Sequence, residues 1–120
     1  MQSLTGIWHN ELKSRMIITS ATDGQLLGTY ETAVGNADGP YQLDGRFESE
    51  GKTLGWVVSW KNEKKISKSS TSWSGKYEAD CDGNIFMIRT TWLITRAEKP
   101  DWDSTNVSFD VFTRGEPPKE

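Results

Sequence analysis

Tryptophans at alternating positions are the feature that most limits how this chain can fold. They occur in three segments, Leu54–Asn62, Ser69–Trp73 and Ile88–Ile94. In the first segment every second residue is apolar: Leu54, Trp56, Val58 and Trp60. Because successive side chains of a β-strand point to opposite faces, each segment is predicted to be a strand that gathers tryptophan on one face. Such a face must be buried, and 6 tryptophans in 120 residues can supply much of a core.

The pattern around these segments predicts eight consecutive short strands and no helix. The strands are predicted over Thr5–Leu12, Met16–Ser20, Leu26–Thr32, Tyr41–Phe47, Leu54–Asn62, Ser69–Tyr77, Ile85–Thr95 and Thr105–Thr113. Asp23-Gly24 and Asp82-Gly83 are hairpin-turn signals, and Lys61–Lys68 is predicted to be a charged loop. Eight antiparallel neighbours can close and so remove both exposed edges. The predicted fold is therefore all-β, an eight-stranded antiparallel up-and-down β-barrel over residues 1–115, followed by a polar tail at 116–120.

Composition excludes several classes of function. The net charge of -3 offers no basic surface for nucleic acid, and no segment approaches the ~20 apolar residues of a membrane span. No apolar signal-peptide region is expected near Met1. A single cysteine, Cys81, cannot form an intrachain disulfide, and a single histidine, His9, argues against a metal site and against most histidine-dependent catalysis. We therefore expect a protein without catalytic residues or metal ligands.

The predicted barrel interior combines tryptophan with polar side chains. The polar members are Asn10, Ser14, Tyr30, Thr32, Ser69, Thr71 and Asp110. A buried polar group without a partner costs about 1–3 kcal/mol, so these groups must satisfy each other, water or a ligand. Aromatic walls with a few convergent polar groups are typical of small-ligand sites. The pattern alone leaves two hypotheses open, a filled barrel and a barrel with a ligand pocket at one mouth. Within Leu54–Asn62, Trp56 is predicted to lie deeper and Trp60 nearer that mouth.

Six ordered segments carry a more specific signal. They are Leu4–Asn10, Gly28–Ala37, Leu54–Asn62, Thr71–Gly75, Thr91–Thr95 and Trp102–Thr113. Together they resemble the avidin/streptavidin family of biotin-binding proteins over nearly the whole chain. The resemblance implies the predicted barrel and a non-enzymatic function, with biotin as bound ligand and no cofactor.

The resemblance also implies roles for individual residues. The ureido oxygen of biotin would accept hydrogen bonds from Asn10, Ser14 and Tyr30, and the ureido nitrogens would donate to Thr32 and Asp110. Thr71 would approach the thioether sulfur. The aromatic walls would be Trp60, Trp73 and Trp92, with further apolar contacts from Leu12, Val34 and Ile94. The backbone N–H of Ala37 and the hydroxyl of Ser69 would meet the carboxylate.

The resemblance further implies association and secretion. Trp102 would reach into the pocket of an adjacent subunit, which predicts a homotetramer, and Val57, Val107 and Phe109 are predicted interface residues. The implied location is extracellular. The alternative hypothesis is a carrier of another small hydrophobic ligand, of the lipocalin type, on a similar barrel.

Overall fold

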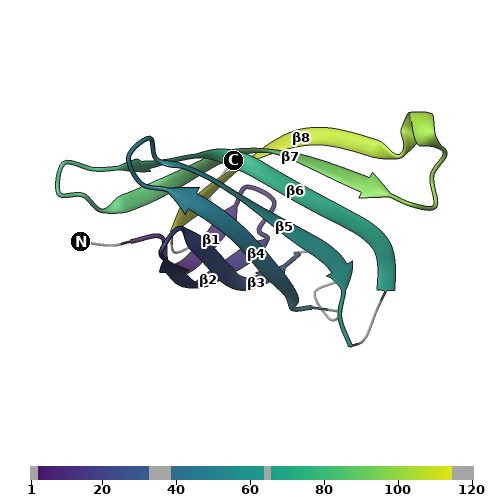
Figure 1. The fold of residues 1–120 in the computed structure, drawn as a ribbon, viewed down its shortest axis with the longest axis horizontal. Helices are drawn as coiled ribbons and strands as arrows, with labels where there is room; N and C mark the ends of the chain where they lie inside the picture. Colours follow the sequence, from purple (N-terminus) through teal and green to yellow (C-terminus); the bar gives the residue numbers. More distant parts are fainter. Residues whose placement is uncertain (1–2, 33–38, 64–65, 115–120) are drawn as a thin grey trace.

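The chain forms a closed barrel of eight antiparallel strands (Figure 1). The computed structural model describes residues 3–32, 39–63 and 66–114. The strands are β1 (Gly6–Asn10), β2 (Arg15–Thr22), β3 (Gln25–Glu31), β4 (Tyr41–Glu48), β5 (Thr53–Lys61), β6 (Ile66–Ala79), β7 (Ile85–Arg96) and β8 (Thr105–Arg114). Each strand pairs with the next along the chain, and β8 returns to pair with β1. The predicted fold class is confirmed.

The strands differ in length, so one wall of the barrel extends beyond the other. β6 has 14 residues and β7 has 12, whereas β1 has 5. In Figure 1 the long strands β6, β7 and β8 run beyond the short strands β1 to β3. The connection between β7 and β8 contains a single 3-10 turn, η2 (Asp101–Asp103). Trp102 in this turn is 87% exposed and is not part of the core.

Two predictions about connections have different outcomes. Gly24 and Gly83 have positive φ angles of 80° and 83°, as the predicted hairpin turns require. The predicted loop at Lys61–Lys68 is wrong in its second half, because β6 already begins at Ile66. Ile66 pairs with Lys61 across an irregularity that follows Ser59. A bulge lets pairing resume after an unpaired residue, and the charged sequence gave no sign of this.

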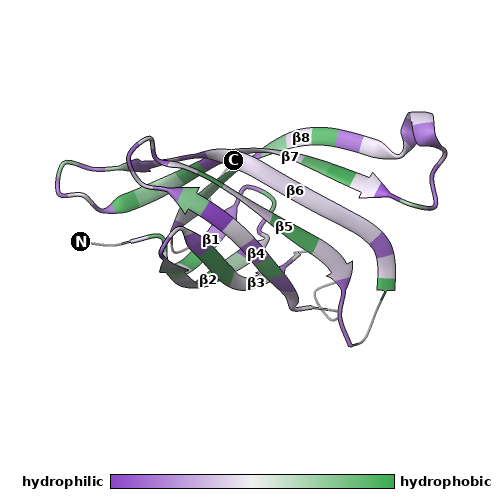
Figure 2. Ribbon diagram, in the orientation of Figure 1, coloured by the Kyte–Doolittle hydropathy of each residue, from purple (hydrophilic) through white to green (hydrophobic). Residues whose placement is uncertain are grey.

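The core is built from alternate residues of all eight strands. The largest fully buried apolar side chains are Trp8, Trp56, Phe112, Met16, Ile18, Leu26, Leu43, Ile88 and Val58. Trp56 is 2% exposed and stacks on Trp73 with ring centroids 5.4 Å apart, within the range of favourable aromatic pairs. Most of β6 is nearly white in Figure 2, because serine, threonine and tryptophan all have hydropathies near zero. Periodicity therefore indicates this core better than hydropathy does.

One end of the barrel is closed by an arginine packed on a tryptophan. The guanidinium carbon of Arg114 lies 4.0 Å from the ring centroid of Trp8, a cation–π contact. Arg114 Nε donates to the carbonyl of Ile85 at 2.8 Å, and Nη1 donates to that of Thr5 at 3.0 Å. Trp8 Nε1 donates to the carbonyl of Leu4 at 2.9 Å. These bonds join both ends of the described chain and leave the opposite end of the barrel as the open one.

Close approach of neighbouring strands requires glycine at Gly75 in β6. A Cβ atom added there would overlap the carbonyl oxygen of Arg89 on β7. The obstruction is backbone, which cannot move without disturbing the longest strand pair. In contrast, a Cβ at Gly51 would meet the flexible carboxylate of Glu48, with Oε1 at 3.1 Å.

We expect Gly75→Ala to lower the free energy of unfolding by about 1–3 kcal/mol, because the strands must separate locally. Urea denaturation followed by tryptophan fluorescence measures the change. Gly51→Ala is the matched control and should have a midpoint close to that of the unmodified protein. Equal midpoints for the two variants would contradict the proposed backbone constraint.

No helix among the residues that the structure describes is long and apolar enough to cross a membrane.

Candidate ligand-binding site

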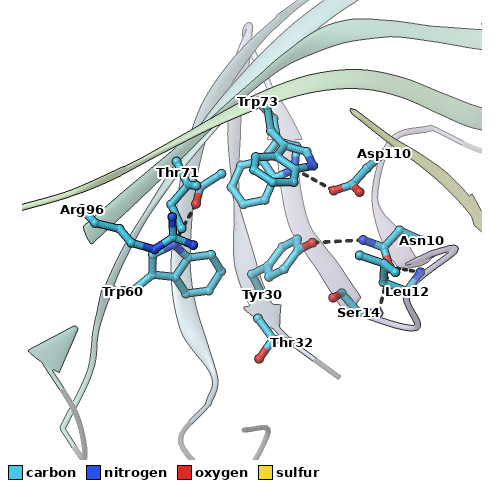
Figure 3. A pocket seen from close by; sticks show the side chains of 12 residues that line it. Asn10, Leu12, Ser14, Tyr30, Thr32, Trp60, Thr71, Trp73, Arg96 and Asp110 are labelled. Carbon is cyan, nitrogen blue, oxygen red and sulfur yellow. Dashed lines mark hydrogen bonds between the residues drawn. The ribbon is translucent and has the colours of Figure 1, made fainter. Parts of the chain in front are cut away.

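The open end of the barrel contains a cavity of about 160 Å³. A single water needs only roughly 10–15 Å³, so the cavity has room for a small molecule. It is lined by Asn10, Leu12, Ser14, Tyr30, Thr32, Trp60, Thr71, Trp73, Trp92, Ile94, Arg96 and Asp110 (Figure 3). These residues come from six of the strands and from the segments that follow β1 and β3. The structure thus favours a ligand pocket over a filled barrel.

The turn between β1 and β2 fixes the polar end of the cavity. The side-chain oxygen of Asn10 accepts hydrogen bonds from the backbone N–H groups of Leu12, at 3.0 Å, and Ser14, at 2.9 Å. Two backbone donors on this oxygen determine the orientation of the amide. Its NH₂ group then faces Tyr30 and donates to the phenolic oxygen at 3.5 Å (Figure 3). The backbone N–H groups of the turn thus occupy the side-chain oxygen of Asn10, and its NH₂ group is directed towards the cavity.

Asp110 places a carboxylate in the same cavity. It is 4% exposed, and its Oδ2 accepts a hydrogen bond from Trp73 Nε1 at 3.2 Å. Burial raises the pKa of Asp110, and nearby Glu11 raises it further, whereas hydrogen bonds from Trp73, Trp92 and Asn10 act in the opposite direction. No cation of the described chain forms an ion pair with Asp110. A further N–H donor from a ligand would therefore be stabilising here.

Tyr30 remains a neutral hydrogen-bond donor. Burial raises the pKa of its phenol, and the negative charge of Asp110 raises it further. The ring of Tyr30 lies 5.0 Å from that of Trp73 and 5.8 Å from that of Trp60, measured between centroids. The phenol is thus held by aromatic packing while its hydroxyl faces the polar end.

The aromatic wall is oriented by hydrogen bonding as well as by packing. Trp60 Nε1 donates to Thr71 Oγ1 at 2.8 Å, across the β5–β6 pair. The ring of Trp60 meets that of Tyr41 edge to face, with centroids 5.0 Å apart. Trp60 is only partly buried and lines the cavity, whereas Trp56 is in the core. The predicted difference between the two tryptophans of β5 is confirmed.

Most residues assigned to biotin from the sequence lie together around this cavity. Those that line it are Asn10, Leu12, Ser14, Tyr30, Thr32, Trp60, Thr71, Trp73, Trp92, Ile94 and Asp110. Ser69 does not line it but pairs with Arg96 at its edge. Val34 and Ala37 are outside the described residues. Trp102 lies on η2, away from the cavity of its own chain.

Sequence reasoning missed one cavity residue, Arg96. The predicted seventh strand ends at Thr95, whereas β7 extends to include Arg96. Every second residue of a strand lies on the same face, so Arg96 shares the face of Trp92 and Ile94. The alternating pattern could therefore have predicted its place at the cavity.

The predicted interface residues are exposed on the outside of the barrel. Val57 is 45% exposed, Val107 62% and Phe109 70%. Their role in association stays a prediction.

The arrangement is suited to holding a small ligand. Donors from Asn10 and Tyr30 and the carboxylate of Asp110 lie together at one end of an aromatic cavity, which suits a molecule with a carbonyl beside an N–H group. Among the described residues, no group of three or more His, Cys, Asp and Glu side chains could hold a metal ion.

Comparison with known proteins gives consistent matches. The model of the avidin family matches residues 1–115. Avidin of Gallus gallus is 34% identical over an alignment of 129 residues that covers 98% of this chain and 82% of that protein. Avidin-related proteins 4/5 and 7 of the same species are 33% and 34% identical, each over 93% of this chain and 77% of theirs. The family match, together with the barrel and its aromatic pocket, shows that this chain belongs to the avidin family.

Proposed function

We propose that this protein is a non-enzymatic binder of biotin. The observation that carries the proposal is the pairing of opposite polar groups inside one aromatic cavity. Donors from Asn10 and Tyr30 lie at one side, and the buried carboxylate of Asp110 lies beside Trp73. A cyclic urea has the matching pattern, because its carbonyl oxygen accepts hydrogen bonds while its two N–H groups donate them.

In this proposal, the ring system and the chain of biotin would meet residues that line the cavity. The ureido oxygen would meet Asn10, Ser14 and Tyr30, and the ureido nitrogens would meet Thr32 and Asp110. Donors that converge on the oxygen and a carboxylate on a nitrogen polarise the ureido group in the same direction, which strengthens both sets of bonds. The thioether ring would lie near Thr71, between Trp60, Trp73 and Trp92. The valerate chain would extend towards Ile94 and the mouth.

Family membership supports the same ligand and adds association and location. We propose that the protein is secreted and forms a homotetramer in which Trp102 completes the pocket of an adjacent subunit. Its 87% exposure within a single chain is unusual for tryptophan and fits such a contact.

Biotin titration followed by tryptophan fluorescence tests the proposal directly. Three tryptophans line the cavity, so binding should change the emission, with saturation at one biotin per chain. A fatty acid serves as the comparison ligand. A protein that ignores micromolar biotin but responds to the fatty acid would refute the proposal and favour the lipocalin-type alternative.

We expect Asp110→Ala to weaken biotin binding by about 2–3 kcal/mol, through loss of a charge-assisted hydrogen bond to a desolvated N–H. The bond needs the ionised carboxylate, whose pKa lies above its ordinary 3.8. Affinity should therefore be full above the raised pKa and should fall as the pH drops through it, starting above pH 3.8. Dissociation rates measured against pH check both effects. Asp82→Ala, at an exposed turn, is the control; an unchanged rate in Asp110→Ala would remove Asp110 from the site.

We expect Trp102→Lys to weaken both biotin binding and tetramer assembly, because a cation would replace the aromatic cover of the neighbouring pocket. Light scattering after size-exclusion chromatography measures assembly, and dissociation rates measure binding. Trp102→Phe retains an aromatic ring and should be affected less. A Trp102→Lys variant that is tetrameric and binds normally would exclude the proposed contact.

A further inference from the structure

Arg96 is the one cavity-lining residue to which no role has yet been assigned. It is the last residue of β7, and its cross-strand partner in β6 is Ser69. Paired residues of neighbouring strands project from the same face of the sheet, so Arg96 and Ser69 share the inward face at the mouth. Figure 3 shows Arg96 beside Trp60 and Thr71, across the cavity from Asp110. The cavity thus has an anionic group at one side and a cationic group at the other.

The position of Arg96 is fixed by bonds to three segments. Its Nη1 donates to the side-chain oxygen of Asn106 on β8 at 2.8 Å. Its backbone N–H donates to the carbonyl of Ser104 at 2.8 Å, and the next N–H, of Ala97, donates to that of Lys68 at 3.0 Å. Anchoring through Asn106 reduces the rotamer freedom that a long side chain would otherwise lose on binding.

The charge of Arg96 has no partner in the described part of the chain. No carboxylate there lies within ion-pair distance of the guanidinium, in contrast to Arg15, which pairs with Glu31, and Arg89, which pairs with Glu78. The bond to Asn106 uses one of five N–H donors. A guanidinium presents its remaining donors as a fork that matches the two oxygens of a carboxylate.

We propose that Arg96, with the hydroxyl of Ser69, forms an anion subsite at the mouth that selects ligands by the charge of their tail. The inference rests on the proposed biotin function and specifies the form of the ligand. Free biotin, whose tail ends in a carboxylate, is preferred over biotin whose tail is capped as a neutral amide. The ureido end of the site contributes equally to both ligands, so the preference originates at the mouth.

The preference is moderate because Arg96 is only half-buried. Water and salt reduce the attraction between partly exposed charges, whereas the bonds at Asp110 are sheltered. A charge-assisted bond at such a position corresponds to about a tenfold difference in affinity at low ionic strength. The difference should shrink as salt is added.

Dissociation rates of free biotin and of its primary amide test the proposal on the intact protein. We expect the unmodified protein to release the amide about tenfold faster than the acid at low salt, and to lose much of this ratio at high salt. Arg96→Gln keeps a donor for Asn106 but removes the charge. The acid should then leave faster, so the ratio of amide to acid dissociation rates should fall to about 1–2. Arg96→Lys should retain part of it. Arg89→Gln, on the outer face of the same strand, is the matched control and should keep the full ratio.

Three outcomes separate this inference from the proposed function. If the unmodified protein binds neither compound, the biotin function itself is wrong. If it binds both with equal rates at low salt, or if Arg96→Gln keeps the ratio, the anion subsite is wrong and the biotin function stands. If Arg96→Gln does not fold, as judged by its emission spectrum, the test uses the unmodified protein alone. A ratio of amide to acid dissociation rates that does not change with salt would then overturn the subsite.

Discussion

The pairing of β1 with β8 is the interaction on which the rest of this structure depends. Trp8, His9 and Asn10 pair with Arg114, Thr113 and Phe112, residues about a hundred positions away in the chain. This pairing removes the two free edges of an eight-stranded meander. It also brings Asn10 onto the wall that carries Asp110, so these two polar groups meet only in the closed barrel. The site therefore depends on closure of the barrel.

Closure has an energetic consequence for the site. Asp110 and Tyr30 are both buried, and the burial disfavours the ionised form of each. The barrel holds them in place with bonds from Trp73 and Asn10 rather than with a cation. Their orientation is therefore set before a ligand arrives. A ligand that bonds to these groups does so at little further cost in conformational entropy.

The sequence predicted the strands and much of the site because both depend on a period of two. Trp56, Trp60, Trp73 and Trp92 all fell on the inward face, as the alternation required. The two Asp-Gly turns were also predicted correctly, because the backbone of such turns needs a residue with a positive φ angle and glycine adopts it easily. What alternation alone could not supply was the role of each polar residue, and this came from the resemblance to a family.

The errors arose where pairing, rather than local sequence, decides the structure. The start of β6 at Ile66 depends on its pairing with Lys61, and a charged segment carries no sign of such a contact. Arg96 was missed because an arginine before a loop resembles an ordinary exposed residue. Its place at the cavity follows from the length of β7, which is set by its neighbours β6 and β8. Strand ends are thus tertiary properties, and the mouth of a barrel consists of strand ends.

The bond from Trp60 to Thr71 gives the cavity wall a hydrogen-bond direction. Because the hydroxyl oxygen of Thr71 already accepts from the indole, the hydroxyl hydrogen must point elsewhere. Thr71 is 3% exposed, so little water is available to receive that hydrogen. The hydroxyl hydrogen of Thr71 is therefore available as a donor at this level of the wall. A soft acceptor such as a sulfur atom could receive this hydrogen, so the indole of Trp60, by orienting the hydroxyl of Thr71, would influence which edge of a ligand ring fits against the wall.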